Sequence, residues 1–488
     1  MSANRFEVGW AQVDITPTGP VSLWGQMHRR ISRRVRDPLT ATAMALKGGR
    51  PATRASYDHA VIVSCDLCGI DPRVQAELRR RLAGKAPGLS PEAVFLCATH
   101  THTGPYTAED QSFTRLFGRF APANPVEEDR DEPPGYQGPA QYAAFLVERL
   151  VEAVLRAWGA RERAVVGRAL GHAVVGHNRR VVYRDGSAEM YGSCNRADFV
   201  RLEAGSDHGV EILYVWRGDA KEPIGVAVNV ACPSQIVEGE RYVSADYWGA
   251  VRGELRGRFG PELHVLPLCG AAGDQSPRDL VRRGRGEPDM YGEPGLAEVG
   301  SRIADAVQAH LPAARESATE EAPFRHVSRA LDLPLRTVSD DEAAAARAEY
   351  DRLRAEIGAS RALTGHDMFA LFPPIGVMLR HEEQQDRQTH EVEAHVLRIG
   401  EAALVTNPFE LYQEFGLRMK ARCRSEQTLI VQLAGGWGGY LPTEPAVAGG
   451  GYGAVVASGT VGPEGGGMLV DETVAMIDGL WEGSASAR

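Results

Sequence analysis

Short apolar runs alternate with longer amphipathic segments along most of the chain. Runs typical of strands lie at 41–46, 59–63, 93–98, 211–216, 224–230, 264–268, 391–398, 402–406 and 428–433. Segments with helical spacing of apolar residues lie at 72–85, 140–158, 246–259, 296–311, 409–424 and 471–481. Ser339-Asp-Asp-Glu342 has the spacing of a capping box and predicts the start of a further helix. This alternation predicts one large α/β domain over 1–488.

The composition excludes several classes of protein. The 488 residues are 43% hydrophobic and 24% charged, as in ordinary globular proteins, and 54 basic against 64 acidic residues give a net charge of −10. That balance argues against nucleic-acid or anionic-membrane partners, which need a positive field. We find no apolar run of about 20 residues and no signal-peptide pattern at the start. We therefore expect a cytoplasmic protein with a small-molecule substrate and no membrane insertion, while homo-oligomer formation stays open.

Cysteine usage fits the same compartment. Seven cysteines, an odd number, are scattered along the chain, which favours reduced thiols over a disulfide framework. Cys65 and Cys68 form a C-x-x-C pair, but a redox motif of this kind begins a helix after its first cysteine, and here the flanks predict a strand and a turn. Core packing is the favoured interpretation.

Polar groups follow the ends of several predicted strands. His100 and His102 come directly after the strand at 93–98, and residues two apart on a strand face the same way, so both imidazoles can point into one cleft. They could bind a metal or transfer protons, or they could be ordinary core and loop histidines. Asp66 follows another predicted strand. It could bind a metal, orient an imidazole, or simply cap a turn.

Three further groups of polar residues also follow the ends of predicted strands. Ser276 lies in the small-residue loop 269–278, Glu410 follows the strand at 402–406, and Trp437 and Tyr440 lie in the glycine-rich segment after 428–433. Each signal is weak alone, but together they predict a cleft at the strand ends. The Pro-, Asp- and Glu-rich stretch 106–139 is expected to be a lid or a mobile surface loop.

The order of these motifs resembles the neutral, non-lysosomal ceramidase family. The matching segments span 13 to 443 and are Val13-Asp-Ile-Thr-Pro17, Ser64-Cys-Asp66, Ala98-Thr-His-Thr-His-Thr-Gly-Pro105, Asn178-Arg-Arg180, Ser244-Ala-Asp246, Gly273-Asp-Gln-Ser-Pro277, Pro408-Phe-Glu410 and Gly439-Tyr-Leu-Pro-Thr443. The resemblance implies a divergent, cytoplasmic, bacterial-type member with mixed β-sheets flanked by helices. It also implies hydrolysis of an amide with one zinc ion.

The resemblance assigns roles residue by residue. His100, Glu410 and Tyr440 correspond to zinc ligands, His102 to a proton-transferring histidine, and Ser276 to a serine beside the metal. Tyr440 and Asp66 are further candidates for catalysis. The remaining motif residues are expected to bind substrate: Arg179, Arg180, Gln235, Asp246 and Trp437.

One departure concerns the metal. The family's second zinc histidine has no counterpart, because the matching stretch reads Asn229-Val-Ala-Cys232-Pro-Ser-Gln235. Cys232 could supply a thiolate ligand. Alternatively Asp66 or His177 completes the site, the metal is lost or changed, or Cys232 and its neighbours bind substrate.

A second departure concerns the substrate. Characterised members are secreted or membrane-associated and carry a C-terminal β-sandwich for which the sequence shows no counterpart, and 435–467 offers few apolar groups for acyl chains. The leading hypothesis is therefore a metal-dependent hydrolase in which activated water attacks an amide or related bond of a small polar substrate. Two alternatives remain: a carbohydrate-active enzyme that uses His102 with Asp66 or Asp246, and a non-catalytic binding protein.

Overall fold

Three β-sheets meet around a shared apolar core in the computed structural model, which describes residues 6–48, 56–108, 117–124 and 132–482. The first sheet has the order β8 (Val94–Ala98), β7 (His59–Cys65), β5 (Thr40–Lys47), β1 (Glu7–Asp14), β9 (Glu162–Arg163). The second has the order β10 (Val165–His172), β15 (Gly209–Trp216), β16 (Gly225–Val230), β18 (His264–Cys269). The third has the order β24 (Gln427–Val431), β22 (Ala402–Thr406), β21 (Thr389–Ile399), β20 (Phe324–Pro334), β6 (Ser56–Tyr57).

Short strands pair in the loops that join these sheets. They are β2 (Ser22–Leu23) with β3 (Arg30–Ile31), β4 (Arg34–Val35) with β17 (Tyr242–Val243), β11 (His177–Asn178) with β19 (Gln275–Ser276), β12 (Arg180–Tyr183) with β13 (Ala188–Met190) and β14 (Phe199–Leu202), and β23 (Glu410–Leu411) with β25 (Tyr440–Leu441). Two of these pairs, β11–β19 and β23–β25, carry residues of the predicted site.

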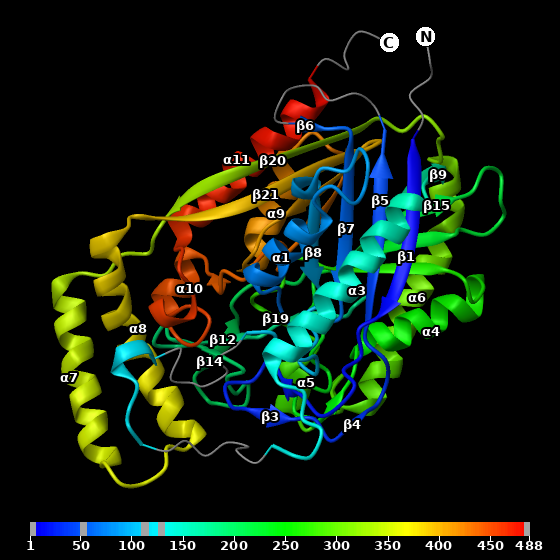
Figure 1. Cartoon of the computed structure of the whole chain (residues 1–488). Coiled ribbons are helices and arrows are strands. Elements are labelled where there is room, and N and C mark those ends of the chain that lie inside the picture. The colour runs from blue at the N-terminus through cyan, green and yellow to red at the C-terminus, as the bar shows by residue number, and fades with distance from the viewer. Residues whose placement is uncertain (1–5, 49–55, 109–116, 125–131, 483–488) are drawn as a thin grey trace.

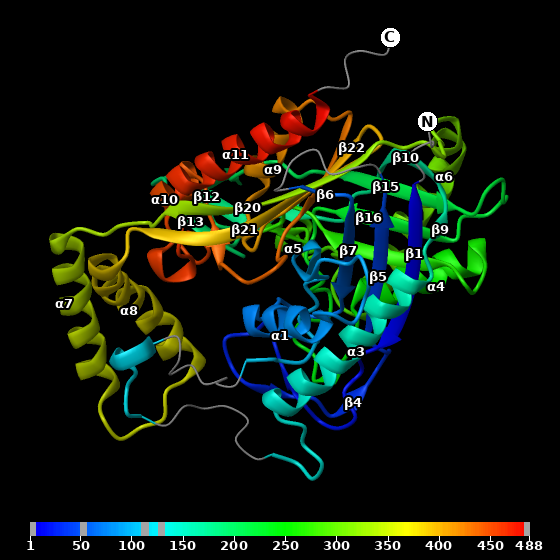
Figure 2. The same ribbon diagram turned by 45° about the horizontal axis from the view of Figure 1, so that its top comes forward.

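Each sheet buries its outer face under two helices. α1 (Pro72–Leu82) and α3 (Pro139–Gly159) pack on the first sheet, α4 (Tyr247–Phe259) and α6 (Glu293–Glu316) on the second, and α9 (Gln413–Arg422) and α11 (Pro463–Trp481) on the third. α7 (Asp340–Ile357) and α8 (Gly365–Asp386) form a helix pair beside the sheets with a small core of their own (Figures 1 and 2). Two short helices, α5 (Leu280–Gly284) and α10 (Glu444–Gly449), complete the set that the structure describes.

One parallel strand pair in each sheet fixes where a site can form. β7–β8, β16–β18 and β22–β24 are parallel, whereas the long neighbours β1–β5, β10–β15 and β20–β21 are antiparallel. The carboxyl ends of the three pairs are tied together: Ala98 N donates to Leu433 O at 3.2 Å, and Gln432 N donates to Cys269 O at 3.0 Å. Loops that follow strands of all three sheets therefore meet at one place.

The predicted α/β class with mixed sheets is confirmed, although several boundaries differ. The Ser339 capping box forms, with Glu342 N donating to Ser339 Oγ at 3.2 Å and Ser339 N to Glu342 Oε2 at 2.7 Å. The helix predicted at 409–424 begins only at Gln413, because Glu410 and Leu411 pair with β25. Parts of the predicted lid, 109–116 and 125–131, lie outside the described residues. Over the described chain, we find no helix with the length and apolar character that a bilayer crossing needs.

Candidate active site

The two motif histidines lie in a loop that several neighbours hold in place. Thr99 N donates to Cys65 O at 2.9 Å, and His102 N donates to Ser234 O at 3.1 Å, so the loop is anchored to the end of β7 in its own sheet and to the segment after β16 in the second sheet. His100 adopts a left-handed backbone with φ 64°, a conformation that costs a non-glycine residue free energy. The rings lie at 81° to one another with centroids 4.9 Å apart. Gly25, with φ 106°, packs so closely on His102 that a Cβ would lie 2.4 Å from the ring.

The hydrogen bond at Nδ1 of His100 decides which nitrogen is free. Nδ1 lies 2.6 Å from the Cys68 carbonyl oxygen, and because a carbonyl only accepts, Nδ1 carries the hydrogen. Nε2 is therefore the nitrogen with the available lone pair. It lies 3.4 Å from Glu410 Oε2. A backbone carbonyl on the far ring nitrogen is also the usual support of a metal-binding histidine.

Glu410 and Tyr440 are brought together by a short parallel bridge. β23 and β25 place these two residues opposite one another, and Glu410 N donates to Gly439 O at 2.8 Å. Both side chains are buried, and the Tyr440 phenol is among the groups that lower the pKa of the Glu410 carboxyl. His100 Nε2, Glu410 and Tyr440 thus converge from two different sheets.

The electrostatic environment of His100 and Glu410 favours a bound cation. Burial opposes ionisation of His100, yet the Cys68 sulfur and the Glu410 carboxylate raise the pKa of His100 to about 10. Burial likewise raises the pKa of Glu410, but His100 and Arg179 lower it below its ordinary value. Two ligand atoms on one tetrahedral zinc lie roughly 3.3 Å apart, from bond lengths of about 2.0 Å. The separation of 3.4 Å between Nε2 and Oε2 fits that requirement.

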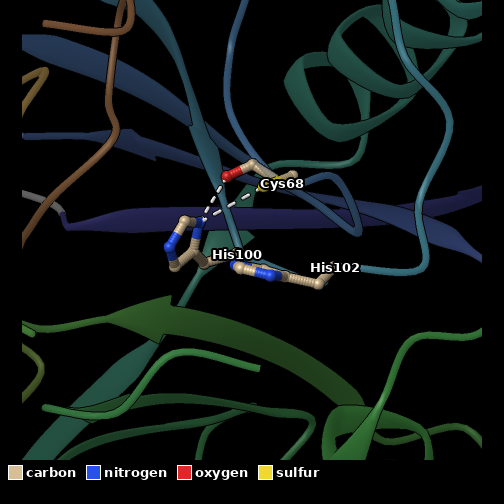
Figure 3. Close-up of side chains that lie close together, drawn as sticks. All are labelled: Cys68, His100 and His102. Carbon is tan, nitrogen blue, oxygen red and sulfur yellow. Dashed lines mark hydrogen bonds between the residues drawn. The ribbon is translucent and has the colours of Figure 1, made fainter. Parts of the chain in front are cut away.

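Cys68 forms an alternative group of donors with the same histidines. Its sulfur and ring nitrogens of His100 and His102 all lie within 4.8 Å of one another (Figure 3). Burial raises the pKa of the thiol, but His102 and His100 lower it, with a net result of about 7. The His100 nitrogen that contacts this sulfur is Nδ1, at 3.7 Å, and it is already bonded to the Cys68 carbonyl. The Nε2 side is therefore the better metal site, and Cys68 lies beside it.

His102 faces a buried carboxylate, Glu238, that was not selected from the sequence. Its Nδ1 lies 3.4 Å from Glu238 Oε2, and Glu238 is held by Gln235 Nε2 at 3.0 Å, Gln26 Nε2 at 3.2 Å and Arg278 Nη2 at 3.1 Å. Burial opposes the cation, yet Cys68 and Glu238 raise the pKa of His102. His102 is thus placed to donate a proton to a leaving group.

A buried guanidinium connects the predicted substrate-binding residues. Arg179 donates to Tyr191 Oη at 2.9 Å, Gln235 Oε1 at 3.2 Å and Tyr440 Oη at 3.3 Å. Tyr191 in turn lies 3.4 Å from Ser276 Oγ. Because β11 pairs with β19, the segments that carry Arg179 and Ser276 are neighbours. The structure therefore brings Arg179, Gln235, Ser276 and Tyr440 into one polar network.

Asp66 and Asp246 are engaged elsewhere. Both oxygens of Asp66 accept from Arg252, at 2.8 and 2.9 Å, in a fully buried pair. Asp246 caps α4 by accepting from Tyr247 N at 2.8 Å, and its second oxygen accepts from Val237 N at 2.9 Å. Burial raises the pKa of Asp246 to about 6. These contacts give both carboxylates a structural role and favour neither as an acid or base.

The proposed substitutes for the missing histidine are also directed away from the metal ligands. Cys232 Sγ faces the carbonyls of Val175 at 3.7 Å and Pro233 at 3.5 Å, and burial raises the pKa of its thiol well above the ordinary value. Within the described chain, no cluster of three His, Cys, Asp or Glu donors includes Cys232. His177 lines a separate pocket of about 850 Å³ with His172 and Asp279. The ligand role expected for Cys232 therefore finds no support in the geometry.

Arg180 and Trp437 differ in their access to a substrate. The Arg180 side chain is fully buried, pairs with Glu203 at 2.8 Å and donates to the Gly450 carbonyl at 2.8 Å. It joins two loops instead of facing the site. Trp437 is 44% exposed and contacts Trp24 edge to face at 5.9 Å, so it remains free to contact a bound molecule.

Two residues beside the proposed ligands, Cys68 and Glu238, were not identified from the sequence. Cys65 packs in the core, as expected, whereas Cys68 contacts His100 instead. Its position could have indicated this: Cys68 comes two residues after Asp66, just past the end of β7, and β7 is parallel to β8, the strand before His100. Glu238 had only a faint signal, a single carboxylate after the apolar Ile236-Val237.

Comparison with known proteins identifies the fold. No protein-family model and no curated protein sequence matches the chain. Solved structures do match: the neutral ceramidase from Pseudomonas aeruginosa has a TM-score of 0.66 at 17% identity, over 98% of this chain and 75% of that one. A ceramidase complexed with C2 has a TM-score of 0.67 at 16% identity, over 98% and 76%. The chain therefore has the fold of the neutral ceramidases.

Proposed function

We propose that the protein is a metal-dependent hydrolase that cleaves an amide or related acyl bond in a small polar substrate. The observation that carries the proposal is the convergence of His100 Nε2, Glu410 and Tyr440, at the strand ends of a ceramidase fold. Imidazole, carboxylate and phenolate oxygens suit zinc. A zinc ion held there would lower the pKa of water and polarise a carbonyl oxygen.

The protein's own residues supply the remaining chemistry. His102 would protonate the leaving nitrogen or oxygen, with Glu238 holding the ring in orientation at 3.4 Å. Arg179 holds Tyr440 in place and neutralises part of the Glu410 charge, 4.0 Å away. Ser276 lies at the edge of this network through Tyr191.

The polarity of the site supports a small polar substrate. Two guanidinium groups, a carboxylate and an amide surround the two histidines: Arg179, Arg278, Glu238 and Gln235. An acyl chain placed against these groups would remove water from them, and their remaining hydrogen-bonding capacity would then be unfilled, which is costly. Hydroxyl, amide or carboxylate groups of a polar substrate would satisfy them.

Elemental analysis and a substrate panel test this proposal. We expect about one zinc per chain and hydrolysis of short N-acyl amides. A chelator should remove the zinc and abolish that hydrolysis. Glu410→Gln should reduce both metal content and kcat/KM, the latter at least about 100-fold. Glu401→Gln is the matched control, because that carboxylate pairs with Arg398 and Trp481 away from the site.

Two outcomes would overturn the proposal. Full zinc content and activity in Glu410→Gln would remove the metal assignment. A higher kcat/KM for long-chain ceramide than for short polar N-acyl amides would remove the substrate assignment. Turnover of glycosides without turnover of acyl amides would favour a carbohydrate-active enzyme instead.

A further inference from the structure

Three histidines from separate segments gather at one end of the second sheet. His172 ends β10, His177 begins β11, and His208 directly precedes β15. The ring centroid of His208 lies 5.6 Å from that of His172 and 6.3 Å from that of His177, at interplanar angles of 72° and 66°. His172 and His177 also line the pocket of about 850 Å³ that is separate from the active site. We call these three residues the histidine cluster.

The spacing of the rings is close to that of imidazoles bound to one metal ion. Two imidazoles on a tetrahedral zinc have ring centroids roughly 5 Å apart, from Zn–N bonds of about 2.0 Å. The separations in the histidine cluster are slightly larger. Among the described residues, only the Cys68 group already has three donor atoms within 4.8 Å of one another, so the cluster needs ring rotations to close on an ion. Such rotations are open to it, because His172 is exposed and His177 and His208 are only half-buried.

The backbone holds the three residues together, whereas one ring nitrogen is left unfilled. Ala173 N, next to His172, donates to His208 O at 2.9 Å. His177 pairs with Ser276 across β11 and β19. Nδ1 of His208 is buried and has no hydrogen-bond partner in the part of the chain that the structure describes. A buried polar atom without a partner is costly, and an ion bound there would satisfy it.

The pocket beside the histidine cluster favours a cation. With its imidazoles neutral, the lining carries an excess of negative charge, because carboxylates outnumber guanidinium groups. The carboxylates are those of Asp279, Asp289, Glu298 and Asp305, and the guanidinium groups are those of Arg282 and Arg302.

Two of the lining residues have donor atoms to spare. Asp279 caps α5 through Oδ1, which accepts from Val281 N and Arg282 N at 3.1 Å each, and this leaves Oδ2 for a ligand. His310 Nδ1 lies 2.9 Å from the Ala306 carbonyl oxygen, so Nδ1 carries the hydrogen and Nε2 has the lone pair. The pocket therefore offers both imidazole and carboxylate donors.

We propose that the histidine cluster, together with Asp279, forms a second metal site that takes a divalent transition-metal ion of the zinc type. Imidazole donors select such ions, whereas sites made of carboxylates alone suit magnesium or calcium. The ion joins the end of β10 to the β11–β19 ribbon, which continues into Arg179 and carries Ser276. Its role is structural, and the inference does not rest on the function proposed above.

The second ion is expected to exchange more easily than the one proposed at Glu410. His172 is exposed and the rings must rotate to bind, so the site is not preorganised. Dialysed protein should therefore keep the zinc at Glu410 and lose the ion at the histidine cluster.

Cobalt titration of the full chain tests the inference. The protein is stripped with a chelator, dialysed, and titrated with Co²⁺ at about pH 7.5, where imidazoles of ordinary pKa are mostly neutral. Calorimetry counts the ions. We expect two Co²⁺ per chain in the wild type and one in the double variant His172→Ala/His208→Ala. His366→Gln is the matched control, because His366 is exposed on α8 and does not line the pocket, and it should bind two.

Further variants separate the two sites. Glu410→Gln should keep the ion at the histidine cluster, and its combination with the double variant should bind none. His172→Ala alone, at an exposed position, should weaken the second Co²⁺ at least about 10-fold. Equal stoichiometry and affinity in the wild type and the double variant would mean adventitious binding only and would overturn the inference. A single Co²⁺ that Glu410→Gln keeps and the double variant loses would instead remove only the metal assignment in the function proposed above.

Discussion

Two pairs of buried histidines in this protein differ in almost every respect except burial. His326 and His395 lie on β20 and β21, inside the third sheet. His326 Nδ1 faces the His59 carbonyl at 2.9 Å, and its Nε2 faces His395 Nδ1 at 2.9 Å. Phe95 stacks on His395 with centroids 4.5 Å apart. Burial and the neighbouring imidazole lower the pKa of His326 well below its ordinary value, and burial lowers that of His395.

The pair in the candidate site is held differently. His100 has a left-handed backbone, and within the part of the chain that the structure describes neither ring nitrogen of His102 makes a hydrogen bond. Cys68 raises both pKa values, together with Glu410 at His100 and Glu238 at His102.

The comparison teaches that burial alone does not distinguish a structural histidine from a functional one. Neutral partners surround His326, and at His395 burial and Arg79 outweigh the Glu393 carboxylate 3.4 Å away. At His100 and His102 the thiol and the carboxylates outweigh burial, so these imidazoles favour a proton or a metal.

The largest expected effect separates function from stability at His100. His100→Gly removes a proposed metal ligand, so kcat/KM should fall at least about 100-fold. The same change relieves the positive φ, so the free energy of unfolding should change by no more than about 1 kcal/mol. Urea unfolding and steady-state kinetics on one preparation check both values. A loss of several kcal/mol would show that His100 supports the fold as His326 does.

The reverse result is expected in the other pair. His326→Ala leaves a cavity and an unpaired nitrogen on His395, and should lower the free energy of unfolding by about 3 kcal/mol. Zinc content and kcat/KM of the folded fraction should remain unchanged, because the ring of His326 bonds to His59 and His395 and to none of the proposed ligands. Loss of zinc in folded His326→Ala would break the contrast between the pairs.

The smallest effect concerns pH. Because the fold lowers the pKa of His326 and His395, their contribution to stability is present above about pH 6.5 and is lost as pH falls through that value. Each proton taken up only on unfolding adds about 1.4 kcal/mol per pH unit to the slope. His395→Gln should flatten the stability curve between pH 7 and 5, measured by urea unfolding. The exposed His366→Gln serves as the control and should leave the slope unchanged.

Much of the fold could be predicted because its signals are local. α3 and α7 were found through helical spacing and a capping box, which act within a few residues. α8 was missed because Pro373 and Pro374 interrupt its interior, and proline there ordinarily ends a helix. β20 was missed because its sequence, Phe324–Pro334, carries charged residues in both halves and no clear alternation.

The candidate site was predictable only in part. Motif order placed His100, Glu410 and Tyr440 together, although each motif alone was weak. The role considered for Cys232 rested on alignment of a gap, and alignment cannot show where a sulfur atom points. Cys68 belongs only to the C-x-x-C pair that was assigned to packing, and Glu238 belongs to no motif. Their place in the site depends on contacts with His100 and His102, which come from a different segment. The cytoplasmic location, the oligomeric state and the lid remain predictions.

The sequence by itself determined the α/β alternation, the strand-end polar residues and the absence of a histidine at 229–235. These properties depend on residue type and short-range spacing. Only the tertiary structure decided which nitrogen of His100 is free, because that depends on the Cys68 carbonyl 2.6 Å away. It likewise showed that Asp66 forms an ion pair with Arg252 and that Glu238 lies beside His102. Contacts between distant segments fix the charge and direction of each group, and sequence spacing cannot supply them.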